Sequence, residues 1–61
     1  MSQADFLDFL EHELRLQGVA FSRADLLAFV AGAWPWIEED PDDMTFWARE
    51  FIASGRASLT T

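Results

Sequence analysis

The chain has no cysteine, no tyrosine and only one histidine among its 61 residues. Without cysteine it can form no disulfide and no zinc site built on thiolate ligands, and one histidine is too few for a histidine-rich metal centre. No apolar run approaches the length of a membrane span. The sequence therefore predicts no metal site, no cofactor and no membrane segment.

Lysine is absent as well, and four scattered arginines stand against eleven acidic residues, for a formal net charge of −7. A nucleic-acid-binding protein needs clustered basic side chains to neutralise phosphates. We therefore expect no direct binding to nucleic acid or to an anionic membrane surface. An acidic surface suits solubility or a basic protein partner. The segment 1–9 holds two aspartates and no basic residue, so we expect no secretory signal and a cytoplasmic protein.

The apolar residues follow the spacing of amphipathic helices in three segments, and nothing alternates like a strand. We expect helices over about 3–17, 23–38 and 41–54, joined by short links. Short links favour antiparallel neighbours, so the predicted fold is all-α, a small three-helix bundle running up-down-up. The helices make one domain over 1–55, and 56–61 is expected to be a flexible C-terminal tail.

Local signals set the predicted helix ends. Ser2 and Ser22 each stand three residues before an aspartate, which is typical of a helix start. Asp40 followed by Pro41 predicts the start of the third helix, and Gly55 predicts its end.

Pro35 falls inside the second predicted helix. Proline removes a backbone donor, and its ring clashes with the carbonyl four residues earlier, which here belongs to Ala31. We therefore expect the second helix to be kinked or broken between Gly32 and Pro35.

The acidic run 38–43 raises the question of a calcium loop. Such a loop needs oxygen ligands at alternate positions and a glycine at the sixth. Counted from Glu39, Pro41 takes the third position and Met44 the sixth. The pattern fails at the turn, and a solvated charge run at a helix start is the interpretation we adopt.

Two titratable side chains are candidates for a catalytic group. His12 lies near Asp8 and Arg15 on the polar side of the first helix, but no serine stands in a nucleophile elbow to complete a hydrolytic triad. Glu13 falls between Phe6 and Phe9 by helical angle, within the apolar half. It must form an ion pair with an arginine, lie at an interface or, least of all, act as an acid catalyst. We predict no catalytic residue and no enzyme.

The aromatic side chains carry the most specific functional prediction. Three tryptophans and six phenylalanines are more ring surface than one small bundle can easily bury. By helical angle, some rings fall outside the apolar stripes, and acidic residues flank them. The predicted partner-binding residues are Phe29, Trp36, Phe46, Glu39, Asp42 and Asp43.

Two functions follow from these features. The first is a small acidic, non-enzymatic protein–protein interaction module, a homodimer being one form, that buries exposed aromatic rings. The second is an acidic inhibitor or nucleic-acid mimic that blocks a basic protein surface. The two functions differ in their response to salt. Binding to a basic surface weakens as ionic strength rises, whereas the affinity of binding driven by ring burial hardly changes.

Overall fold

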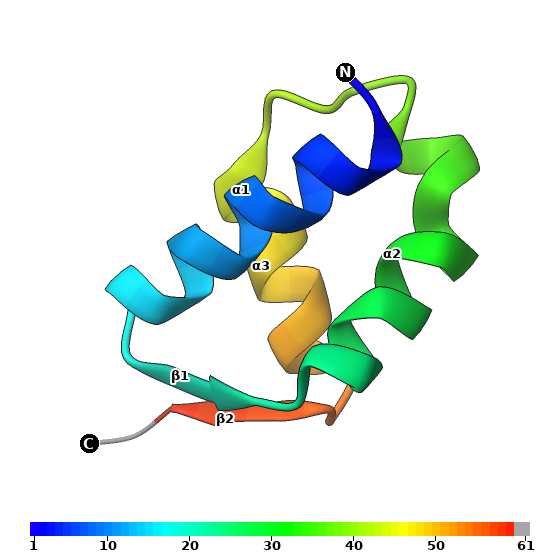
Figure 1. Cartoon of the computed structure of the whole chain (residues 1–61). Helices are drawn as coiled ribbons and strands as arrows, with labels where there is room; N and C mark the ends of the chain where they lie inside the picture. The colour runs from blue at the N-terminus through cyan, green and yellow to red at the C-terminus, as the bar shows by residue number, and fades with distance from the viewer. Residues whose placement is uncertain (60–61) are drawn as a thin grey trace.

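The computed structural model describes residues 1–59 of the chain. Three helices and two short strands follow in the order α1 Gln3–Leu16, β1 Val19–Phe21, α2 Arg23–Ile37, α3 Met44–Ala53 and β2 Ala57–Leu59. Figure 1 shows α1 crossing over α3, with α2 beside them and the strand pair closing one end. The prediction of a compact, mostly helical fold with three helices is confirmed.

The serine caps fall where the sequence places them. Ser2 Oγ accepts a hydrogen bond from the backbone N–H of Asp5 at 3.1 Å. Ser22 Oγ accepts one from the N–H of Asp25 at 3.4 Å. Each bond satisfies a donor that the first helical turn would leave unpaired. Gly18 lies just beyond the end of α1 and has a φ of 72°, a left-handed angle that ends a helix and that glycine adopts without strain.

Helix α2 runs without a break from Arg23 to Ile37 and includes Pro35. The break considered near this proline is therefore wrong. The helix continues past it because the backbone N–H of Glu38 still donates to the carbonyl of Trp34 at 2.8 Å, and because Ile37 is fully buried.

Helix α3 begins at Met44, three residues later than the predicted start at residue 41. Its N-cap is Asp43, whose carboxylate accepts a hydrogen bond from the N–H of Phe46 at 3.1 Å. The Trp47 indole Nε1–H donates to the carbonyl of Asp40 at 3.0 Å, which fastens the preceding turn to α3. Asp40, Asp42 and Asp43 were all available as caps, and the cap is Asp43, the aspartate closest in sequence to the apolar residues of α3.

The strand pair was not predicted from the sequence. β1 and β2 are antiparallel, with Val19 opposite Leu59, Ala20 opposite Ser58 and Phe21 opposite Ala57. Each strand has three residues, too few to show an alternating pattern. Residues 57–59, assigned to the tail from sequence, therefore form β2, while residues 60–61 lie outside the described part of the chain.

A single apolar core lies between the three helices and the strand pair. Its buried members are Phe6, Leu7, Leu10, Leu14, Val19, Leu26, Val30, Ile37, Trp47, Ala48 and Phe51. Two further rings meet this core edge to face, Trp34 on Phe6 at 6.0 Å and Phe21 on Phe51 at 6.1 Å between centroids. Within residues 1–59 no polar or charged residue is buried. None of the helices in this range combines the length and hydropathy needed to cross a bilayer.

Candidate functional site

Two of the predicted partner-binding residues share a groove beside α2. It has a volume of about 260 Å³ and is lined by Ala28, Phe29, Gly32, Ala33, Trp36, Ser54 and Arg56, which we call the α2 groove. The Trp36 side chain is 64% exposed. Phe29 departs from the prediction, because it is half-buried and its ring packs on Phe51 at 5.3 Å between centroids. Phe29 therefore forms a wall of the groove that is held by the core, and Trp36 stands free at the surface.

The other predicted residues do not join this groove. Phe46 is 45% exposed on α3, where its ring meets that of Trp47 at 4.9 Å. Asp43 caps α3, and Glu39 is exposed in the turn before it. Of the six residues named from sequence, only Phe29 and Trp36 thus share a groove.

A second groove lies between α1 and the segment that leads into α3. Its lining residues are Met1, Phe9, His12, Glu13, Pro41, Asp42 and Met44, and its volume is about 320 Å³; we call it the α1 groove. Its main apolar residue, Phe9, is not among the predicted partner-binding residues: helical angle places it in the apolar half of α1, yet it is 55% exposed. The unusual position of Glu13 beside Phe9 was the signal that marked this edge of α1.

The structure separates the side chains that were weighed for catalysis. Asp8 pairs with Arg23 at 3.7 Å rather than with His12. Glu13 accepts a hydrogen bond from Gln17 Nε2 at 2.9 Å, and among residues 1–59 it forms no ion pair with an arginine. No cluster of three His, Cys, Asp or Glu side chains able to hold a metal ion occurs in the same range.

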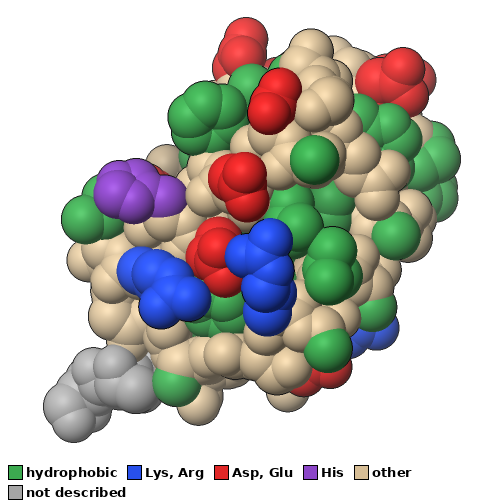
Figure 2. Space-filling model, in the orientation of Figure 1, with side chains coloured by type: hydrophobic (Ala, Val, Ile, Leu, Met, Phe, Trp, Pro, Cys, Tyr) green, Lys and Arg blue, Asp and Glu red, His purple; other side chains and the backbone are tan. Residues whose placement is uncertain are grey.

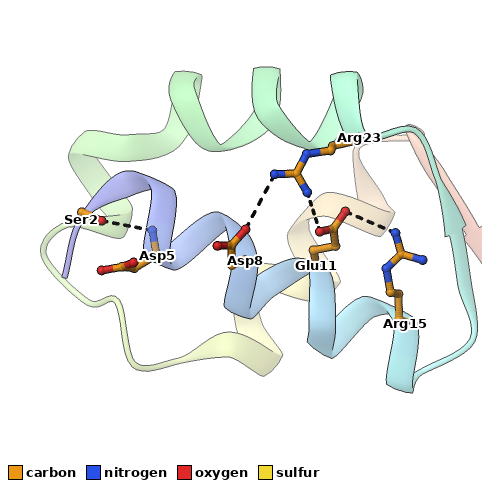
Figure 3. Close-up of polar contacts among 6 residues, drawn as sticks. All are labelled: Ser2, Asp5, Asp8, Glu11, Arg15 and Arg23. Carbon is orange, nitrogen blue, oxygen red and sulfur yellow. Dashed lines mark hydrogen bonds and ion pairs between the residues drawn. The ribbon is translucent and has the colours of Figure 1, made fainter.

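Two of the ion pairs among residues 1–59 share Glu11, on the polar side of α1. Figure 3 shows its carboxylate between two guanidinium groups. Arg23 donates to it from α2, and Arg15 donates from the next turn of α1 at 3.4 Å. The Glu11 side chain is only 15% exposed. These contacts join α1 to the start of α2. Figure 2 shows one face of the molecule, on which basic (blue) and acidic (red) side chains lie next to one another.

Two opposing effects act on the pKa of Glu11. Burial raises the pKa, but the hydrogen bonds and positive charges of Arg23 and then Arg15 outweigh it, so the pKa lies below its ordinary value of 4.5. A carboxyl group whose pKa falls on folding stabilises the fold above its unfolded pKa and loses that contribution as the pH drops through the folded value.

Replacing Glu11 by glutamine is therefore expected to lower the free energy of unfolding by about 1 kcal/mol at pH 7. The difference from wild type should shrink as the pH falls below 4.5 toward the lowered pKa of Glu11. Urea unfolding followed by circular dichroism across pH measures it. Glu50→Gln is the matched control, because that exposed carboxylate forms no ion pair within residues 1–59. A Glu11→Gln deficit that stays constant from neutral to acid pH would contradict the assignment.

Comparison with known proteins finds no matching protein family, curated protein or solved structure for this chain. The features of the molecule that bear on function are therefore the two grooves and the charge around them.

Proposed function

We propose that this chain is a non-enzymatic protein-interaction module that pairs with a second copy of itself through the α2 groove. The observation that carries the proposal is the exposure of Trp36, which leaves most of an indole ring in water beside an apolar groove. A tryptophan ring offers a large apolar area, and such residues often anchor protein interfaces.

The charge around the α2 groove supports a second copy as the partner. Two chains of net charge −7 repel each other over most of their surface. The residues that line the α2 groove include no carboxylate and include Arg56. This is therefore a surface on which two copies can meet with little repulsion.

The spacing along α2 supports a two-fold arrangement. Ala28 and Trp36 stand one helical turn to either side of Gly32. If two α2 helices cross antiparallel at Gly32, each Trp36 ring reaches Ala28 of the other copy, as a self-complementary interface requires. A β-carbon added at Gly32 would meet nothing within 4 Å in the single chain. The space above Gly32 is thus available for close approach of a second helix.

Two finer features of the fold belong to the proposal. We infer that the three helices run up, down and up, and that α2 bends where Pro35 removes the backbone donor for the carbonyl of Ala31. A bend at this point would set the direction in which Trp36 leaves the helix. Phe46 and the acidic residues Glu39, Asp42 and Asp43 would lie outside the buried contact, the acids steering the encounter with a partner.

Sedimentation velocity and thermal unfolding over a concentration series test self-association. Wild type should reach twice the chain mass, and its melting temperature should rise with concentration. Trp36→Asp should stay monomeric. Gly32→Ala should unfold at a higher temperature when dilute, because alanine favours helix by about 1 kcal/mol over glycine. The added methyl groups would collide at the crossing, so its dimer dissociation constant should rise about tenfold or more.

The matched control is Leu16→Asp, which places the same charge on another exposed apolar side chain, 71% accessible on α1. It should leave the dimer intact. A wild type that remains monomeric with a constant melting temperature, or a Leu16→Asp variant that dissociates as readily as Trp36→Asp, would refute pairing through the α2 groove. Salt separates the alternative of an acidic inhibitor, whose binding to a basic surface would weaken steeply as ionic strength rises.

A further inference from the structure

The α1 groove differs from the α2 groove in its lining. Phe9 from α1 and Met44 from the first turn of α3 supply apolar surface, with Pro41 beside them. Met44 also packs against the core, so this wall is anchored. Methionine adapts its shape to varied apolar partners. The groove volume of about 320 Å³ is enough to receive one or two apolar side chains of another molecule.

Two carboxylates stand in the same lining, Glu13 on α1 and Asp42 in the loop. Neither forms an ion pair within residues 1–59. The loop beside them carries further acids at Glu38, Glu39 and Asp40, all exposed. An apolar groove with an acidic border is therefore present on one side of the molecule.

The arginines of the chain do not neutralise this border. Arg15 and Arg23 are engaged with Glu11 and Asp8. Arg49 and Arg56 are not among the residues that line the α1 groove. His12 and the amino group of Met1 also lie at the α1 groove, but neither forms an ion pair with Glu13 or Asp42 within residues 1–59. Basic side chains of a binding partner can therefore supply positive charge to both carboxylates.

We propose that the α1 groove binds a basic amphipathic helix of a partner protein. Apolar side chains one turn apart on that helix contact Phe9 and Met44, and flanking lysine or arginine side chains pair with Glu13 and Asp42. Added-strand binding does not suit this place, because no residue of β1 or β2 lines the groove. A second copy does not suit it either, since its own charge of −7 would oppose the acidic border. The inference rests on the proposed role as an interaction module but does not need self-association.

The test uses a short designed helix with leucine on one face and lysine on the other, titrated into the full-length chain labelled with nitrogen-15. Amide shifts should change at Phe9, Glu13, Asp42 and Met44. The same helix with glutamate in place of lysine should bind more weakly, with a dissociation constant at least about tenfold higher. Phe9→Ser should raise the dissociation constant about tenfold, since a central aromatic contact is lost. Leu16→Ser, at an exposed apolar position outside the groove, is its matched control and should change nothing.

The double variant Glu13→Gln and Asp42→Asn separates charge from ring contact. It should bind the lysine helix several-fold more weakly and show a smaller loss of affinity on adding salt, while Glu50→Gln should match wild type. Absence of binding, equal binding of both helices, shifts centred on the α2 groove, or equal losses from Phe9→Ser and Leu16→Ser would each overturn the proposal. A chain that stays monomeric yet binds at the α1 groove refutes only self-association. A chain that dimerises and fails this titration refutes only the α1 groove.

Discussion

Replacing Phe51 by alanine is expected to leave the chain largely unfolded at room temperature. The ring is fully buried and meets Phe21 of β1 at 6.1 Å and Phe29 of α2 at 5.3 Å between centroids. One side chain thus joins α3 to both β1 and α2. Loss of a buried phenylalanine ring costs about 3–5 kcal/mol. A core of this size rarely supplies more than about 3–5 kcal/mol of net stability, so the two quantities are of the same order.

Urea unfolding followed by far-ultraviolet circular dichroism measures this loss, with Phe9→Ala as the matched control. The control removes the same ring from a position that is 55% exposed. It should change the free energy of unfolding by about 0.5 kcal/mol or less. A Phe51→Ala variant that folds almost as well as wild type, or a Phe9→Ala variant that loses as much, would mean that the core is centred elsewhere.

The helices were predictable because their ends depend on nearby residues. The hydroxyls of Ser2 and Ser22 bond to amides three positions ahead, and Gly18 and Gly55 take left-handed angles just after helices. The start of α3 was misplaced because several aspartates compete as caps. The choice depends on Trp47, which donates to the turn from seven residues away.

The strand pair depends on residues far apart in sequence. Phe21 pairs with Ala57, and α2 and α3 separate the two strands along the chain, so each strand finds its hydrogen bonds on a distant segment. Nothing in a three-residue segment encodes such a partner. The same pairing places the Phe21 ring on Phe51, which explains why a residue that seemed part of a link contributes to the core.

The surface was only partly predictable for a similar reason. The exposure of Trp36 and Phe46 followed from their helical angles. Helical angle also assigned Phe9 to the apolar half of α1, but α2 and α3 cover only part of that half. Which part of α1 the other two helices cover depends on how the helices pack. In the sequence, only Glu13, a charged residue within the apolar half of α1, indicated where the covered surface ends.

Replacing Pro35 by alanine is expected to stabilise the single chain and weaken its pairing. Proline inside a helix costs about 3 kcal/mol relative to alanine, although less near an end, and Pro35 stands two residues before the last residue of α2. Proline also restricts the unfolded chain, which returns about 0.4–1 kcal/mol. The expected net gain is therefore about 1–2 kcal/mol in dilute solution.

Pro41→Ala is the matched control, because Pro41 lies in the turn before α3 and outside every helix. There, only the restriction of the unfolded chain is lost, so a loss of about 0.4–1 kcal/mol is expected, opposite in sign to the change at Pro35. If Pro35 bends α2 and so directs Trp36, straightening the helix should raise the dimer dissociation constant even as the melting temperature of the dilute chain rises. Stabilisation with unchanged pairing would show that the bend has no part in presenting Trp36, and destabilisation would show that α2 depends on its proline.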